Sequence, residues 1–415
     1  MFALPLASKR IALFTGAYNH IADGVSLTLN RLVRHLQEAG AEVMVFAPTV
    51  DQPALEHAGT LDPVRSVAAP FRPDYRISLR ISASQFERLE AFKPHLVHVA
   101  TPDIPGGQAL RWAKKNGIPA VASYHTHFAS YLSYYYLGWT EKLMWAHLRR
   151  FYSKCRHTYV PSQSMADVLG EHGITAGVRL WRRGVELDRF DPAHRDMEWR
   201  RKLGFADDDV VVTLVSRLVL EKGLGVFADT VNMVAARGLK IRCLVVGDGP
   251  ARSFLEEQIP DAVFLGHQTG DALSKAYASS DVFVFPSYTE TFGNVTLEAM
   301  ASGLPAVCAD ATGSQSLVLP GKTGFLAPPE NAEVFAAHLA RIVSDTELRQ
   351  RMSAAARKEA TTYAWPRVLD GIVGFYQEIL VGQGDGQANG IPSFAGPAVR
   401  AKLRPVVLDG VVVAG

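Results

Sequence analysis

Two glutamates with seven residues between them flank a Gly-Asn step in the segment from Pro286 to Pro305. Gly293 permits close approach of the backbone, and Asn294 is a good N-cap for a helix beginning at the next residue. The free amide groups and positive dipole end of that helix would face an anion. Glu290 and Glu298 would then accept hydrogen bonds from hydroxyl groups on either side of that anion. A nucleotide sugar carries hydroxyl groups around its phosphates in this way.

A pair of basic residues, Arg217 and Lys222, follows the apolar run Val210 to Ser216, which is typical of a buried strand. Two cations held at a strand end beside a glycine-containing turn would suit a diphosphate whose negative charge grows as a bond breaks. The alternative is a surface loop that carries two solvated charges.

The turn Gly247-Asp248-Gly249 follows another apolar run and has the beginning of a dinucleotide-binding fingerprint. Arg252 occupies the third glycine position of that fingerprint, so we reject a nicotinamide-dependent dehydrogenase. We expect instead a strand-to-helix turn that lines a base or ribose pocket.

Two further candidate sites lie where strands of the N-terminal half of the chain are expected to end. His125, in the sequence Ser-Tyr-His-Thr-His, is either a structural hydrogen-bonding residue or a contact to a transferred group. His127 could pair with it on a metal, but no third ligand stands nearby, and we expect no metal site. Asp23 and Gly24 lie at the first strand-to-helix turn, where they could contact a phosphate or acceptor, or Asp23 could simply cap the helix.

Two series of alternating strand and helix patterns predict an α/β protein with two doubly wound domains. Strands are expected at 10–15, 42–47, 96–100, 120–124, 210–216, 241–246, 263–266 and 282–286, and helices at 25–39, 224–237 and 365–380. The expected division is a first domain over 1–184, a second over 185–364, a helix at 365–381 that crosses back to the first domain, and a disordered tail over 382–415.

Composition and charge limit the classes of function. No apolar run is long enough to span a bilayer, and the three cysteines lack metal-ligand spacing, so we expect a cytoplasmic protein with reduced thiols. Residues 1–184 contain 21 Lys and Arg against 13 Asp and Glu, whereas the remainder contains 22 against 28. The basic half would suit an anionic membrane surface or acceptor, although scattered solvated charge is the alternative. The acidic half argues against nucleic-acid binding.

These motifs, in this order, resemble those of the retaining GT-B glycosyltransferases of family 4, from Arg10 to about Leu380. The His125 segment and its aromatic continuation resemble the branch with sulfoquinovosyl- and glucuronosyl-diacylglycerol synthases and related mannosyltransferases. The resemblance implies two Rossmann-like domains facing a cleft, with the acceptor on the first and the nucleotide sugar on the second. It implies no cofactor and no essential metal.

The resemblance also implies roles for individual residues. Arg217 and Lys222 would hold the diphosphate, Glu298 would bind the ribose hydroxyls, and Glu290 would contact the donor sugar. His125 would reach that sugar from the opposite domain. The backbone at Phe292, Gly293 and Asn294 would help to fix the sugar, and the donor would also lie near Gly247 and Gly249. Family members often have paired glycines where this chain has Asp23 and Gly24, which leaves open whether this turn contacts a phosphate or the acceptor.

The leading hypothesis is a transferase that moves a hexosyl or uronosyl group from a UDP- or GDP-linked sugar to a lipid or lipid-linked acceptor at the inner face of the cytoplasmic membrane. A soluble small-molecule acceptor is the second hypothesis. A non-catalytic protein that binds nucleotide sugars is the third. The motifs do not distinguish uracil from guanine.

Overall fold

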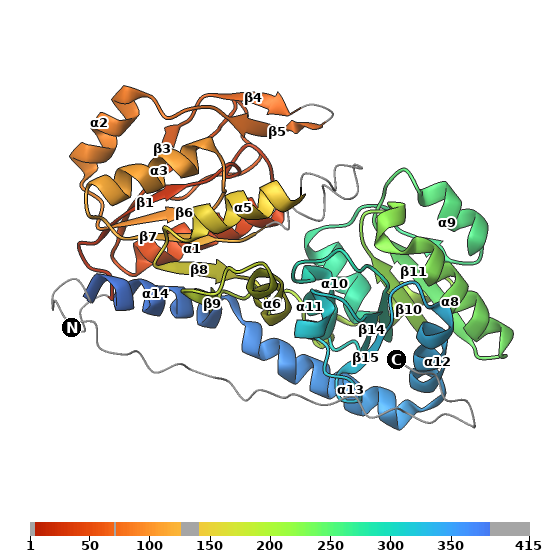
Figure 1. The fold of residues 1–415 in the computed structure, drawn as a ribbon. Coiled ribbons are helices and arrows are strands. Elements are labelled where there is room, and N and C mark those ends of the chain that lie inside the picture. Colours follow the sequence, from red (N-terminus) through yellow and green to blue (C-terminus); the bar gives the residue numbers. More distant parts are fainter. Residues whose placement is uncertain (1–4, 70–71, 126–140, 382–415) are drawn as a thin grey trace.

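Parallel strands flanked by helices form each of two domains in the computed structural model, which describes residues 5–69, 72–125 and 141–381 (Figure 1). The predicted class, two doubly wound α/β domains, is confirmed. The first domain contains β1 (Arg10–Phe14), α1 (Gly24–Glu38), β2 (Glu42–Ala47), β3 (Thr60–Pro63), β4 (Ser66–Ala69), β5 (Arg72–Ser78), α2 (Ala83–Phe92), β6 (Leu96–Val99), α3 (Ile104–Lys115), β7 (Ala120–Ser123), α5 (Glu141–Tyr152), β8 (His157–Val160), α6 (Gln163–Glu171) and β9 (Val178–Leu180).

The second domain begins after a connection that includes Arg183 and Val185. It contains η2 (Pro192–His194), α7 (Met197–Lys202), β10 (Val210–Val215), η3 (Leu220–Lys222), α8 (Leu224–Ala236), β11 (Ile241–Val246), α9 (Arg252–Gln258), β12 (Val263–Phe264), α10 (Gly270–Ala278), β13 (Val282–Phe285), α11 (Asn294–Ala301), β14 (Ala306–Ala309), η4 (Ser314–Ser316), β15 (Gly324–Ala327), α12 (Ala332–Ser344), α13 (Thr346–Ala360) and η5 (Thr361–Tyr363). Helix α14 (Trp365–Val381) follows.

The order of the strands fixes where each sheet can bind a ligand. The first sheet runs β3-β2-β1-β6-β7-β8-β9 and the second β12-β11-β10-β13-β14-β15, with every pairing parallel. In the first sheet, β2 and β3 are added on one side of β1, and the chain then returns to add β6 on the other side. In the second sheet, β11 and β12 lie on one side of β10 and β13 lies on the other. The strand order therefore reverses between β1 and β6 and between β10 and β13. Ligands of doubly wound sheets bind beyond the carboxyl ends of the strands at such points.

Burial explains why the central strands could be recognised. All six residues of β10 are buried, as expected for a strand covered by helices on both faces. In β10 and β13, Val212 pairs with Val282 and Thr213 with Phe283, so the carboxyl ends of the two strands lie side by side.

Helix α14 packs against the first domain, along the lower edge of Figure 1. Its residues Ile372 and Tyr376 are fully buried in a core that also includes Leu13 of β1. The hydroxyl group of Tyr376 lies 2.6 Å from Nδ1 of His98 in β6. Just before this helix, the amide of Val185 donates to the carbonyl of Tyr363, so the two crossings between the domains run side by side. The tail expected to be disordered lies outside the described residues.

None of the helices in residues 5–69, 72–125 and 141–381 has the length and continuous apolar character that a bilayer span requires. The cysteines expected to be reduced are free, with Cys308 buried and Cys155 and Cys243 half-buried. Burial raises the pKa of each thiol to about 12, so all three remain protonated at neutral pH.

Candidate functional site

The loops after β10 and β13 carry the predicted cations and the first glutamate, and they lie at the reversal point of the second sheet. Gly223 has φ of 73°, and a Cβ atom there would lie 2.9 Å from Cβ of Pro286. This close approach requires glycine, and it brings the two loops into contact.

Lys222 and Glu290 form an ion pair across these loops. Nζ of Lys222 lies 2.5 Å from Oε1 of Glu290, and their side chains are only 15% and 24% exposed. The hydroxyl group of Ser287 also donates to Oε1 of Glu290, at 3.3 Å. The backbone carbonyl of Glu290 accepts a hydrogen bond of 2.7 Å from the hydroxyl group of Thr312. The structure thus brings together one predicted diphosphate ligand and the predicted sugar ligand.

Arg217 belongs to the same loop as Lys222 but does not join this pair. Its side chain is 61% exposed, and its guanidinium group lies 3.8 Å from the carboxylate of Glu221. A contact this long with a half-buried carboxylate holds the exposed side chain of Arg217 weakly. Arg217 is therefore free to reorient toward a ligand.

The Gly247 and Gly249 turn supports the loop that carries Arg217. Added Cβ atoms at these glycines would lie 1.8 Å from the carbonyl oxygen of Ser216 and 2.4 Å from that of Leu218. The amide of Leu218 donates to the carbonyl of Asp248. Both glycines are thus required by backbone packing, and their contact with a base or ribose stays a prediction.

The start of α11 differs from the prediction in one respect. The predicted N-cap, Asn294, is instead the first helical residue, and Gly293 is the N-cap, with φ of 92°. The left-handed backbone explains the difference, because glycine adopts it without strain whereas asparagine would be strained there. Because Gly293 has no side chain, it makes no capping hydrogen bond, which leaves the first amide groups of the helix available to a ligand. Phe292, just before it, is buried.

The N-terminus of α1 faces that of α11 from the other domain. An added Cβ at Gly24 would lie 3.5 Å from Nδ2 of Asn294. Asp23 is the N-cap of α1, and its carboxylate accepts hydrogen bonds from the amides of Val25 and Ser26 at 3.1 and 2.8 Å. The capping role is thus confirmed, and a phosphate or acceptor contact stays a prediction.

Glu298 lies one turn into α11, where Oε2 accepts a hydrogen bond of 3.2 Å from the hydroxyl group of Tyr277. Burial raises the pKa of Glu298 to about 7, although the Tyr277 bond acts in the opposite direction. Near neutral pH the carboxyl group is therefore partly protonated, and it can donate as well as accept hydrogen bonds to ribose hydroxyls.

This raised pKa predicts a pH dependence of stability. Since the folded protein holds a proton on Glu298 that the unfolded chain releases, the free energy of unfolding should fall as pH rises from about 4.5 to about 7. The Glu298→Gln variant does not lose stability in this way, so the melting temperature of its second domain should gain several degrees on the wild type between pH 5 and pH 8, at about 2–4 °C per kcal/mol for a domain of this size.

A matched control for that experiment is Glu257→Gln, at an exposed position of α9. Its melting temperature should follow the wild type at both pH values. A Glu298→Gln variant that also follows the wild type would contradict the raised pKa.

The structure places His125 at the carboxyl end of β7, with both ring nitrogens engaged. Nδ1 lies 3.1 Å from Nη2 of Arg183, and Nε2 lies 2.8 Å from Oγ of Ser123. Because arginine can only donate, Nδ1 must accept, and the proton of the neutral ring lies on Nε2. Burial, followed by the charge of Arg183, holds the pKa of His125 well below its usual value. The predicted side-chain contact with a sugar stays a prediction. His127 and the aromatic segment lie outside the described residues.

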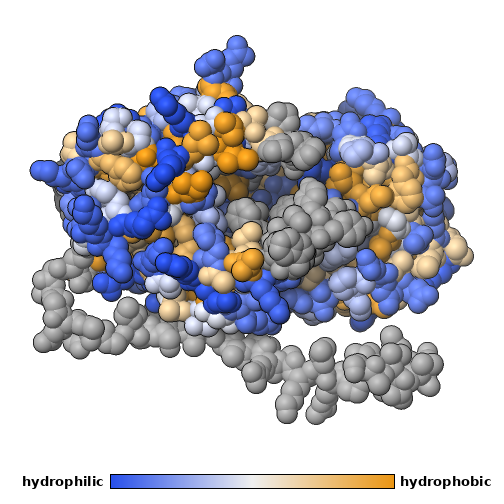
Figure 2. Space-filling model, turned by 45° about the horizontal axis from the view of Figure 1, so that its top comes forward, coloured by the Kyte–Doolittle hydropathy of each residue, from blue (hydrophilic) through white to orange (hydrophobic). Residues whose placement is uncertain are grey.

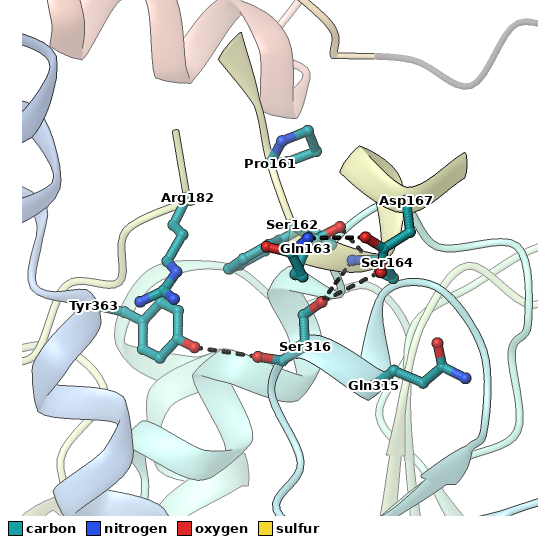
Figure 3. Close-up of a pocket in the computed structure, with 10 residues that line it drawn as sticks. Pro161, Ser162, Gln163, Ser164, Asp167, Arg182, Gln315, Ser316 and Tyr363 are labelled. Atoms are coloured by element: carbon teal, nitrogen blue, oxygen red, sulfur yellow. Dashed lines mark hydrogen bonds between the residues drawn. The ribbon is translucent and has the colours of Figure 1, made fainter. Parts of the chain in front are cut away.

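Serines of the first domain contact the glutamate loop, which sequence patterns did not predict. The hydroxyl group of Ser162, the N-cap of α6, donates to the carbonyl of Thr291 at 3.0 Å, and Ser164 bonds the carbonyl of Thr312. Ser164 also lies 3.1 Å from the hydroxyl group of Ser316 (Figure 3). They border a cavity of about 300 Å³ lined by residues of both domains. Only the polar composition of residues 310–316 gave a sign of these contacts.

Within the described ranges, no group of three or more His, Cys, Asp or Glu residues is arranged to hold a metal ion. Independence from metal stays a prediction that requires a direct test.

Comparisons with known proteins agree with this geometry. Residues 196–359 match the family model for glycosyl transferases group 1, and residues 22–189 match the model for glycosyltransferase family 4. The chain is similar to a GDP-mannose-dependent alpha-mannosyltransferase of Mycobacterium tuberculosis, at 35% identity over 90% of this chain and 98% of that protein. It is also similar to sulfoquinovosyl transferase SQD2 of Arabidopsis thaliana, at 34% identity over 86% of this chain and 71% of that protein. An alpha-monoglucosyldiacylglycerol synthase of Streptococcus pneumoniae is 27% identical over 72% of this chain and 70% of that protein.

Among solved structures, sucrose-phosphate synthase from Thermosynechococcus elongatus has a TM-score of 0.71 at 20% identity, covering 90% of this chain and all of that one. Anabaena HepE in complex with UDP and glucose has a TM-score of 0.67 at 18% identity, covering 89% of this chain and all of that one. The chain therefore belongs to the group 1 glycosyltransferases of family 4, and its fold is GT-B.

Proposed function

We propose that this enzyme transfers a hexosyl or uronosyl group from a nucleotide sugar to a lipid acceptor, with retention of the anomeric configuration. The observation that carries the proposal is the Lys222–Glu290 pair, 2.5 Å apart, on loops at the reversal point of the second sheet. The uncapped N-terminus of α11 follows the Glu290 loop. These groups provide a cation, a hydroxyl acceptor and free amides where a ligand of a doubly wound domain binds.

In the proposed mechanism, Lys222 and Arg217 stabilise the charge that grows on the diphosphate as the bond to the sugar breaks. The carboxylate of Glu290 is held by Lys222 and Ser287, which suits it to orient sugar hydroxyls. The leaving phosphate oxygen takes the proton of the acceptor hydroxyl on the same face of the sugar. The new bond therefore forms on the face from which the diphosphate departs, and the configuration is retained.

Two observations support a lipid acceptor. One relative is named for diacylglycerol glycoside synthesis, as an alpha-monoglucosyldiacylglycerol synthase. In addition, the first domain is basic and exposes apolar side chains among hydrophilic ones (Figure 2). The exposed apolar side chains of this domain include Leu27, Val67, Ile77, Leu79 and Ile104. A basic domain with exposed apolar side chains suits the surface of an anionic membrane. We place the enzyme at the inner face of the cytoplasmic membrane.

The direct test is to incubate the purified protein with diacylglycerol vesicles and labelled UDP- or GDP-linked sugars. A labelled glycolipid with the anomeric configuration of the donor is the expected product. Transfer only to a water-soluble acceptor would contradict the lipid acceptor, and an inverted product would contradict the proposed mechanism. Stable binding without any transfer would make the chain a nucleotide-sugar-binding protein without catalysis.

Membrane association gives a separate prediction. The protein should sediment with phosphatidylglycerol vesicles at low salt but not with phosphatidylcholine vesicles, since each basic residue near an anionic surface contributes roughly 1 kcal/mol. Raising the salt to about 0.5 M should release at least about nine-tenths of it, because the interaction is screened. As a matched variant, Val67→Ser with Ile77→Ser removes a cross-strand apolar pair and should weaken binding. Failure to sediment at low salt would count against the membrane location.

Metal removal gives another prediction. Since Lys222 and Arg217 are assigned to the diphosphate, treatment with EDTA should change turnover by less than about twofold, far below the 100-fold scale of losing an electrostatic donor. The control is a re-addition series with Mg²⁺ and Mn²⁺. A loss of more than tenfold that either ion restores would show that the reaction needs a metal.

A further inference from the structure

Helix α6 of the first domain begins against the loop of the second domain that carries Glu290. The hydroxyl group of Ser162, the N-cap of this helix, lies 3.0 Å from the carbonyl oxygen of Thr291. Two residues later, the hydroxyl group of Ser164 bonds the carbonyl oxygen of Thr312 (Figure 3). A carbonyl group can only accept, so both serines must donate. The first domain thus supplies two hydrogen bonds to the backbone around the glutamate.

Both accepting residues are tied directly to Glu290. Thr291 follows Glu290 in the chain, and the hydroxyl group of Thr312 donates to the carbonyl of Glu290 at 2.7 Å. The turn that contains Thr312 also packs tightly on this loop. A Cβ atom added to Gly313 would lie 2.8 Å from Cβ of Glu290 and 2.9 Å from the carbonyl carbon of Phe292. A hydrogen bond that fixes Thr291 or Thr312 therefore also restricts the backbone of Glu290.

Capping of α6 does not require the proton of Ser162. An N-cap side chain needs only to accept, and Ser162 accepts from the amide of Met165 at 3.2 Å. Ser82, the N-cap of α2, accepts from the amide of Gln85 in the same way, and its proton has an acceptor in its own helix, Oε1 of Gln85 at 3.1 Å. The proton of Ser162 goes instead to the other domain, at a residue only 2% exposed. The cap thus leaves the bond between the domains unexplained.

We infer that Ser162 and Ser164 are positioning residues of the transfer reaction, which hold the Glu290 loop from the opposite domain. This inference rests on the proposed function, because Glu290 orients the sugar there. The carboxylate of Glu290 lies 2.5 Å from Nζ of Lys222, and such a polar group acts at full strength only while its backbone is fixed. Since α6 belongs to the first domain, the reaction centre is complete only while the two domains are in contact.

The Ser162→Asp variant separates the two roles of this residue, because aspartate caps a helix as serine does but has no proton to donate at neutral pH. With labelled UDP- or GDP-linked sugars and diacylglycerol vesicles, kcat should fall about 10- to 100-fold, the rate equivalent of leaving a buried carbonyl unpaired. Binding of UDP or GDP alone, measured by titration calorimetry, should change by less than about threefold, because Lys222 and Arg217 are left intact.

Three further variants keep the test independent of folding. Ser162→Thr retains both the cap and the donor, and it should restore most of the wild-type kcat. Ser82→Asp makes the same change at the exposed cap of α2 and should leave kcat within about twofold. Ser164→Ala leaves the cap of α6 intact and removes only the bond to Thr312, so kcat should fall about 3- to 10-fold, the range for one hydrogen bond. Melting temperatures show whether each variant is folded.

Hydrogen exchange on the full chain gives a measurement that needs no substrate. In Ser162→Asp, the amides of residues 286–293 should exchange at least about threefold faster than in the wild type, because the loop has lost its bond to the first domain. Residues 163–171 of α6 should keep their wild-type protection, because the cap is retained.

Wild-type kcat in both Ser162→Asp and Ser164→Ala would overturn the inference, as would an equal loss of kcat in Ser162→Thr. Faster exchange confined to α6 would also overturn it, because the loss would then come from an uncapped helix. These outcomes leave the proposed function standing. Failure of the wild type to transfer any sugar would overturn the proposed function instead, and the exchange of residues 286–293 would then decide whether the serines hold the loop.

Discussion

Replacing Lys222 by alanine should lower kcat by about 100- to 1,000-fold, the scale measured when one preorganised electrostatic donor is removed from an active site. Two effects act together in this variant. The diphosphate loses a cation as its charge develops, and Glu290 loses the partner that lies 2.5 Å from its carboxylate. Since both side chains are largely buried, solvent replaces the lost interaction poorly. Steady-state rates with saturating donor and acceptor measure the effect.

A lysine outside the site provides the matched control. Lys275 of α10 pairs with Asp196 at 3.0 Å, and its side chain is 41% exposed. Lys275→Ala should therefore leave kcat within about twofold of the wild type, since a partly exposed pair contributes little. Should Lys222→Ala behave in the same way as Lys275→Ala, Lys222 would have no part in catalysis.

Replacing Arg217 by alanine should lower turnover by about 100-fold or more. The physical reason differs from that for Lys222, because Arg217 is exposed and only loosely associated with Glu221. Its side chain must therefore reorient when the donor binds, and it contributes mainly in the transition state. We accordingly expect the loss to fall on kcat more than on the affinity for the donor.

Arg252 is the control for Arg217, because it pairs with Glu256 at the same four-residue spacing on α9. Arg252→Ala should retain the wild-type rate. Wild-type turnover in a purified Arg217→Ala protein would refute the role assigned to Arg217.

The fold could be predicted well where strands are long and covered on both faces. The expected strand at 42–47 matches β2, and the expected strand at 241–246 matches β11; others end within one or two residues of the prediction. Short strands were missed, among them β8, β9, β14 and β15. Their sequences, HTYV, VRL, AVCA and GFLA, contain polar residues, alanine or glycine, which weaken the strand pattern, whereas the equally short β13 consists of valine and phenylalanine alone.

The site could be predicted where one motif supplies neighbouring residues, and not where two domains meet. Glu290 and Glu298 lie on one loop and the helix after it, so their local arrangement follows from spacing alone. The contacts of Ser162 with Thr291 and of Arg183 with His125 join residues 129 and 58 positions apart. No local pattern encodes such contacts. The shift of the α11 cap from Asn294 to Gly293 likewise depends on a backbone angle that composition does not determine.

The most direct measurement is a crystal structure of the protein with UDP or GDP bound, whichever binds more tightly. We expect the diphosphate at the N-terminus of α11, within hydrogen-bond distance of Lys222 and Arg217, and the ribose hydroxyls at the carboxyl group of Glu298. A nucleotide bound elsewhere on the molecule, with Lys222 still paired only to Glu290, would contradict this expectation.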